Sequence, residues 1–152
     1  MTERDRRTLV AHGALVFLVG LMAGFPFAFE ILGRAELWPI PGGFDFDPPG
    51  DVRGWRMAHL EGILNGMLLF GVAAVAPLLQ LGPRGAAWVT RGLLVCAWGN
   101  IIASWIGPLS ETRGLAFSGA SWNSLVYLLF IAAIIGIVGA MVAIYAGARQ
   151  ER

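Results

Sequence analysis

Long stretches without a charged residue divide this chain, and short charged or Pro- and Gly-rich segments separate them. Four such stretches cover residues 8–29, 62–83, 92–110 and 114–148. Each has room for the about 20 residues that a helix needs to cross a bilayer. None alternates apolar and polar positions as the strands of a membrane barrel do. Because a backbone in hydrocarbon must bond within its own segment, the pattern predicts four membrane-spanning helices.

The breaks in this pattern set the expected boundaries. We predict an all-α integral membrane protein, a four-helix bundle in one domain over residues 1–152, with helices at about 8–32, 55–81, 86–106 and 122–148. The second and third helices are joined by a very short connection, so they should be antiparallel neighbours. The first and second helices are joined by a long loop rich in Pro and Gly.

Composition agrees with a membrane protein. Charged residues make up 14% of the chain, against about 25% in soluble domains. The net charge of +1 predicts no nucleic-acid partner. Residues 2–7 are charged and precede an apolar run, but no A-x-A-like cleavage site follows, so we expect a retained first helix. The single cysteine, Cys96, excludes an intrachain disulfide.

The placement of arginine predicts the orientation. Four arginines fall on one side of the expected helices, namely Arg34, Arg53, Arg56 and Arg113. The other seven fall with the two termini and the short connection, namely Arg4, Arg6, Arg7, Arg84, Arg91, Arg149 and Arg152. Since cytoplasmic loops carry the excess of basic residues, both termini should be cytoplasmic, in the inner membrane of a bacterium.

The second helix carries the polar residues of most interest, because ionisable groups inside a membrane are costly. His59, Gly62 and Gly66 are spaced i, i+3, i+7 and share one face, where a planar ligand such as a porphyrin would meet nearly bare backbone. Glu61 and Asn65 share a different face at i, i+4. The alternatives are that His59 and Glu61 meet water at the membrane surface, and that Asn65 bonds a neighbouring helix.

Polar residues of the first and third helices have simpler explanations beside the functional one. Asn100 and Ser104 are spaced i, i+4 in the third helix; Ser104 is also explained by a bond to its own backbone. His12 is also explained as an interfacial residue, and Gly20-x3-Gly24 as a helix-packing pattern. With two histidines on different helices, the most economical cofactor needs one protein ligand, and haem with an axial histidine fits.

The stretch Gly54-Trp55-Arg-Met-Ala58-His59-x5-Asn65-Gly66-Met67 resembles the G-W-x-x-A-H-x5-N-G-M stretch of the styrene oxide isomerase family. Trp98-x-Asn100 and the later Arg113-Gly114-Leu115-x-Phe117 resemble further family elements in the same order. The resemblance covers most of the chain, including its length, its four helices and the histidine in the first helix.

The resemblance implies a membrane homotrimer that binds haem b between subunits. His59 would be the axial ligand of the iron, with Gly62, Gly66 and Asn100 near the cofactor. Ferric iron would act as a Lewis acid on the oxygen of an epoxide. Ring opening would build a benzylic cation, a hydride would shift, and an aldehyde would result. Asn65 would position the epoxide oxygen.

Three positions depart from the family pattern. Ser104 stands where the family has a catalytic tyrosine, and Cys96 where it has an aspartate. Glu61 stands where the family has a small residue. We therefore expect a small apolar epoxide other than styrene oxide as substrate, with Glu61 or Ser104 replacing the missing polar partner.

Two other hypotheses remain open at this point. One is a haem membrane protein without isomerase activity, serving gas sensing, electron transfer or haem handling, in which Glu61 moves protons. The other is a small transporter or structural subunit without haem, in which Glu61 and Asn65 line a pathway. A transferred motif decides little where a catalytic position differs.

Overall fold

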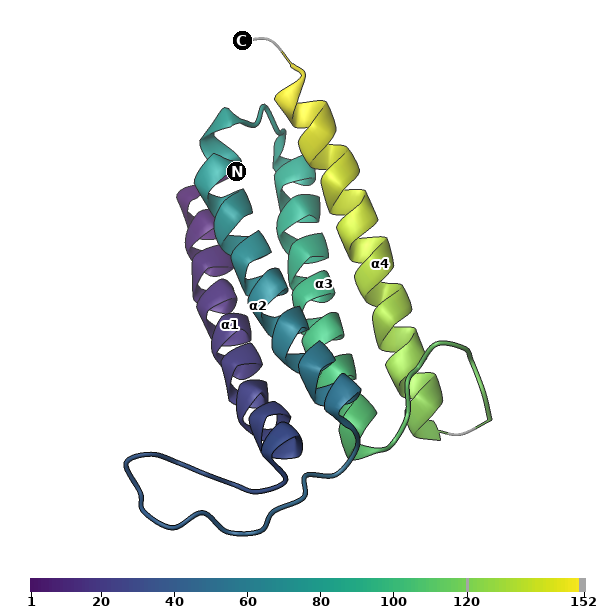
Figure 1. Ribbon diagram of the computed structural model, residues 1–152. Helices are drawn as coiled ribbons and strands as arrows, with labels where there is room; N and C mark the ends of the chain where they lie inside the picture. Colours follow the sequence, from purple (N-terminus) through teal and green to yellow (C-terminus); the bar gives the residue numbers. More distant parts are fainter. Residues whose placement is uncertain (120, 151–152) are drawn as a thin grey trace.

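The computed structural model describes residues 1–119 and 121–150, and most of these residues are helical (Figure 1). The elements are α1 (Glu3–Leu32), α2 (Val52–Val75), the short 3₁₀ helix η1 (Ala76–Leu78), α3 (Pro83–Leu109) and α4 (Ser121–Ala148). All four α-helices are long and apolar enough to cross a membrane. The only strand-like pairing among the described residues is an isolated bridge between Ala35 and Phe44. The prediction of an all-helical protein with four helices that are each able to span a membrane is confirmed.

The helices begin earlier than the apolar pattern predicts, because capping residues and a proline, which hydropathy does not register, set their first turns. Thr2 and Asp5 form a reciprocal capping box at the start of α1. The carboxylate of Asp51 accepts the backbone N–H of Gly54 at 2.6 Å and caps α2. Pro83 opens α3, at a position whose missing N–H costs nothing. The predicted starts at residues 8, 55 and 86 are therefore late by three to five residues.

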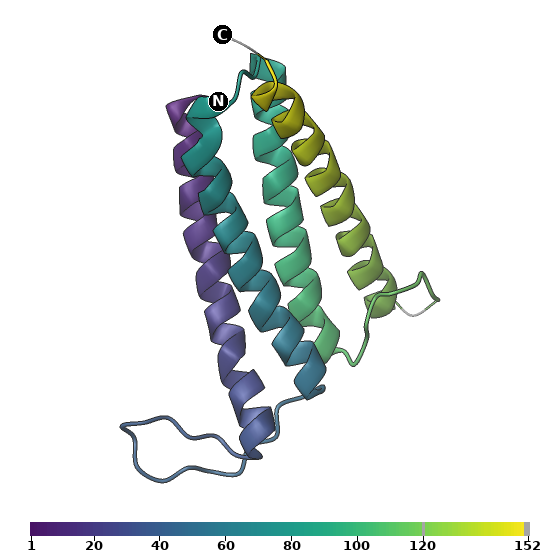
Figure 2. The ribbon, with the colours of Figure 1, turned by 45° about the horizontal axis from the view of Figure 1, so that its top comes forward.

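The helices form two antiparallel pairs, α1 with α2 and α3 with α4, and α2 joins the pairs by packing on α3 (Figure 1, Figure 2). The connection from α2 to α3 is tied to the end of α4 by a hydrogen bond from Gln80 N–H to the Gly147 carbonyl, at 2.9 Å. The N-terminus lies at the same end of the molecule as the end of α4, as predicted. Arg152, which contributed to the predicted orientation, lies outside the described residues.

Close helix contacts depend on facing glycines. A Cβ added to Gly62 of α2 would lie 2.2 Å from the Cα of Gly20 in α1. A Cβ on Gly92 of α3 would lie 2.6 Å from the carbonyl oxygen of Gly136 in α4. Lipid tails provide no hydrophobic force between helices, so close backbone packing of this kind holds the pairs together.

Candidate functional site

His59 faces α1, where a main-chain atom fixes its ring. The ring Nδ1 lies 2.9 Å from the carbonyl oxygen of Gly20. A carbonyl oxygen only accepts hydrogen bonds, so Nδ1 carries the hydrogen of this bond. In the neutral ring, Nε2 then holds a free lone pair. The ring of Phe27 stacks on that of His59 with centroids 6.2 Å apart, which further restrains the imidazole.

Gly24 provides the space that the imidazole occupies. A Cβ at this position would lie 3.1 Å from both Nδ1 and Cε1 of His59. The pattern Gly20-x3-Gly24 therefore serves two purposes one helical turn apart. Gly20 lets α2 approach and accepts the bond from His59, and Gly24 clears room for its ring. Helix packing alone explains only the first of these.

The glycines that follow His59 do not form an open face. Gly62 lies against Gly20, and a Cβ on Gly66 would lie 2.7 Å from the Cβ of Phe17 in α1. Both glycines are buried. The prediction that a flat ligand lies on His59, Gly62 and Gly66 together is wrong within one chain, because α1 already covers the two glycines. The close contact of Gly62 with Gly20 brings the Gly20 carbonyl within reach of His59.

Asn65 faces the other way, toward α3, so α2 does direct polar groups to two sides. Its amide nitrogen donates to the Glu61 carboxylate at 2.8 Å and to the Glu61 carbonyl at 2.9 Å. Its amide oxygen lies 3.5 Å from the Cys96 sulfur and 3.5 Å from the Asn100 amide nitrogen. Asn65 is 5% exposed. We refer to Glu61, Asn65, Cys96 and Asn100 as the Asn65 network.

This network bears on two expectations from the sequence. The interhelical hydrogen bond proposed for Asn65 is present. Asn100 places its amide against Asn65 and its own-helix neighbour Cys96, at 3.5 Å and 3.7 Å, and its place near a cofactor stays a prediction. Cys96 and Glu61, two of the positions that depart from the family pattern, meet at one residue, Asn65.

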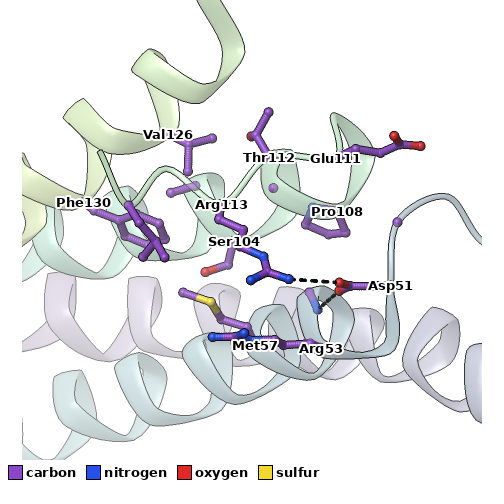
Figure 3. A pocket seen from close by; sticks show the side chains of 15 residues that line it. Asp51, Arg53, Met57, Ser104, Pro108, Glu111, Thr112, Arg113, Val126 and Phe130 are labelled. Atoms are coloured by element: carbon purple, nitrogen blue, oxygen red, sulfur yellow. Dashed lines mark hydrogen bonds and ion pairs between the residues drawn. The ribbon is translucent and has the colours of Figure 1, made fainter. Parts of the chain in front are cut away.

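Ser104 follows Asn100 by one turn of α3, but it makes no hydrogen bond to the Asn65 network. Its side chain is 3% exposed, and its hydroxyl has no hydrogen-bond partner among the described residues. It lines a cavity of about 320 Å³ between α2, α3, α4 and the segment after α3 (Figure 3). The structure thus divides the predicted site residues among His59, the Asn65 network and this cavity.

His12 has a partner that the sequence did not predict. Trp98 Nε1–H of α3 donates to His12 Nδ1 at 3.0 Å. Since Nδ1 accepts here, the neutral ring carries its hydrogen on Nε2. The two histidines therefore hold opposite tautomers, and only His59 has a ring lone pair left over. Among the described residues, no group of three or more His, Cys, Asp or Glu side chains is arranged around a metal position.

Comparison with known proteins gives one consistent result. The sequence model of the family described as styrene oxide isomerase matches residues 5–149. The chain belongs to the styrene oxide isomerase family. A curated relative, the styrene-oxide isomerase of Pseudomonas fluorescens, is 30% identical over 118 residues, which cover 77% of this chain and 69% of the relative.

Membership in the styrene oxide isomerase family indicates an isomerase with an epoxide as substrate class. The match spans all four helices, so His59, the Asn65 network and the cavity all lie inside it. The sequence did not predict that Gly20, Gly24 and Phe27 surround His59. The small-residue spacing of the two glycines was the only feature of the sequence that indicated a close contact there.

Proposed function

We propose that this protein binds haem b through His59 and rearranges a small apolar epoxide to a carbonyl compound. The observation that carries the proposal is the hydrogen bond from His59 Nδ1–H to the Gly20 carbonyl, at 2.9 Å. Metal-ligating histidines almost always donate their second ring N–H to a carbonyl or carboxylate, which fixes the ring and makes the free nitrogen more basic. His59 has this arrangement, and His12 has the opposite one.

The residues around His59 fit an axial ligand. His59 is the residue that would hold the haem, and its free Nε2 would supply the protein ligand. Phe27 and the space left by Gly24 hold the imidazole in one orientation. Because α1 covers Gly62 and Gly66, the haem would have to bind outside the α1–α2 contact. We therefore propose that a second copy of the chain covers it, in the homotrimer that the resemblance implies.

Ferric haem, when bound, supplies a Lewis acid for the epoxide oxygen. The chain's own contribution is to orient the substrate and to stabilise the positive charge that develops at its carbon. Asn65 anchors one oxygen of the Glu61 carboxylate at 2.8 Å. We assign the negative charge of Glu61 to stabilising the developing cation, in the manner of a preorganised electrostatic group. In this chain Glu61 then takes the place of the acid missing at Cys96.

The absorption spectrum of detergent-purified protein tests haem binding. We expect a Soret band in wild type, its loss in His59→Ala, and its retention in the matched control His12→Ala. Undiminished haem in His59→Ala would refute the assignment of the ligand. Turnover of a panel of aryl and alkyl epoxides, without added reductant, tests the reaction. Haem-loaded protein that leaves the whole panel unchanged would refute the isomerase proposal.

One observation favours a second candidate, a haem protein without isomerase activity. Both hydrogens of the Asn65 amide are taken by Glu61, so Asn65 has no hydrogen free for a substrate oxygen in this arrangement. Such a protein would show a reversible ferric/ferrous couple and bind CO or NO, and it would not consume epoxides. The same purified sample distinguishes the two candidates.

A further inference from the structure

A groove lies between α1 and α2 at the end of the molecule that carries the N-terminus. The start of α1 lies beside the end of α2 there (Figure 1, Figure 2), and the groove has a volume of about 390 Å³. We call it the Arg6 groove. Its lining consists of Glu3, Arg6, Arg7, Val10 and Ala11 of α1, with Phe70, Ala73 and Ala74 of α2.

The lining of the Arg6 groove changes from charged to apolar along the helices. Its three charged residues belong to the short charged segment that precedes the first apolar run. All its other residues lie within the apolar runs 8–29 and 62–83. Since an apolar run marks the part of a helix inside the bilayer, the groove passes from the level of the lipid headgroups into that of the acyl chains. A charged mouth and an apolar floor match the two parts of a phospholipid.

Arg6 is held at the groove by a carbonyl that α2 does not satisfy itself. Its Nε–H donates to the Ala73 carbonyl at 3.2 Å. In a regular α-helix this carbonyl would accept the N–H of the residue four positions later, but that residue is Pro77, which has no N–H. The bond ties the side chain to α2 and leaves it 40% exposed. Arg6 therefore presents its guanidinium at a fixed place in the mouth of the groove.

The charges at the mouth favour an anion. The carboxylate of Glu3 accepts from Arg7 Nε at 3.0 Å and from Arg6 Nη1 at 3.3 Å, so it is shared between two guanidinium groups. Two arginines against one glutamate leave the lining with a net charge of +1. A guanidinium has more N–H donors than these bonds use, and its planar fork suits the oxygens of a phosphate.

We propose that the Arg6 groove binds an anionic phospholipid, with its phosphate on Arg6 and Arg7 and an acyl chain along Val10 and Phe70. Basic pockets between membrane helices bind anionic headgroups in this way. The apolar floor favours a lipid over a free phosphate ion, because only a lipid covers it. The phosphate competes with Glu3 for the two arginines. The proposal depends neither on haem nor on epoxide turnover.

Native mass spectrometry of the full-length protein, delipidated in detergent, tests the proposal. The anionic lipid POPG and the zwitterionic lipid POPC, which have the same acyl chains, are titrated separately, and the dissociation constant of the tightest lipid adduct is measured. Wild type should bind POPG about fivefold more tightly or better. Glycerol phosphate, a headgroup without acyl chains, should not displace POPG at equal concentration. Equal binding of the two lipids, or displacement by glycerol phosphate, would overturn the proposal.

A pair of arginine variants locates the headgroup. Arg7→Gln should weaken POPG binding about fivefold and leave POPC binding unchanged. Arg4→Gln removes the same charge from the first turns of α1 but lies outside the lining, so it should weaken POPG binding much less. Equal losses in the two variants would show that POPG responds only to the total charge of the N-terminus, and they would overturn the proposed site.

Two further pairs test the competition with Glu3 and the apolar floor. Glu3→Gln releases both arginines and should tighten POPG binding about fivefold, whereas Asp5→Asn makes the same charge change outside the lining and should tighten it less. Ala74→Trp fills the floor at an exposed position and should weaken POPG binding, whereas Val75→Trp, at the exposed position next to it, should not. Unchanged POPG binding in Glu3→Gln or in Ala74→Trp would overturn the proposal.

Discussion

The amide of Asn65 donates to both the side-chain carboxylate and the main-chain carbonyl of Glu61, at 2.8 Å and 2.9 Å. One side chain therefore bridges a helical turn of α2, and its remaining amide oxygen is directed to α3. This arrangement fixes one oxygen of the carboxylate and leaves the other free. It also places a carboxylate beside Cys96, with no acidic residue of α3 involved.

Replacing Glu61 by Gln tests the role of its charge. Gln keeps an oxygen that accepts from Asn65 but removes the negative charge, so we expect turnover of the epoxide substrate to fall about 10- to 100-fold with haem content unchanged. Turnover per haem, from aldehyde formation and the Soret absorbance, is the measurement. Glu36→Gln, in the loop before α2, is the matched control. Full turnover in Glu61→Gln would rule out an electrostatic role.

Gly62→Ala should separate α1 from α2. The added Cβ would lie 2.2 Å from the Cα of Gly20, so the backbones must move apart, at a cost of about 1–3 kcal/mol. We expect a lower thermal unfolding midpoint and less haem per protein. Gly71→Ala is the control on the same helix, because its Cβ would meet nothing within 4 Å. Equal midpoints for the two variants would contradict the proposed contact.

Gly24→Ala acts on His59 more gently. Its Cβ would lie 3.1 Å from two atoms of the imidazole, so the ring must shift by a few tenths of an ångström while the helices keep their places. The fold should be retained, and the Soret band should move or weaken. The absorption spectrum and thermal midpoint are recorded together. A spectrum identical to that of wild type would show that Gly24 does not set the ring position.

Asp51→Ala should destabilise the start of α2. It removes the acceptor of the Gly54 N–H, and the loss of such a cap costs about 0.5–2 kcal/mol. Circular dichroism during heating, in one detergent, gives the change in midpoint. Asp51→Asn retains a capping oxygen and loses the charge that faces Arg113, so it should recover most of the loss. Asp47→Ala, in the same loop, should have little effect.

The fold was accessible from the sequence because the bilayer imposes a simple rule. A run of apolar residues must form a helix. The run at residues 8–29 lies within α1, and the run at residues 92–110 ends one residue beyond α3. The helix starts were harder to place. Thr2 and Asp51 are polar and lie outside the apolar runs, and their effect comes from capping geometry that hydropathy does not measure.

The candidate site could be predicted from the sequence only in part. Helical spacing correctly predicted that His59 and Asn65 lie on different sides of α2, because the angle between two residues follows from the turn of about 100° per residue. It did not reveal which helix covers each side. Gly62 and Gly66 therefore looked like an open surface, whereas α1 packs on them. The sequence predicts neither the hydrogen bond from His59 to the Gly20 carbonyl nor the cavity beside Ser104, because both depend on how the helices pack together.

The partner of His59 is a main-chain atom, and this limits how the ligand can be altered. A substitution at position 20 cannot remove a carbonyl, so no side-chain change deletes this acceptor as it would delete a carboxylate. The carbonyl also has no proton to gain in acid, so the bond lasts through pH changes that would disable a titrating partner. A protein engineer who wishes to retune this ligand must therefore change the distance between two helices.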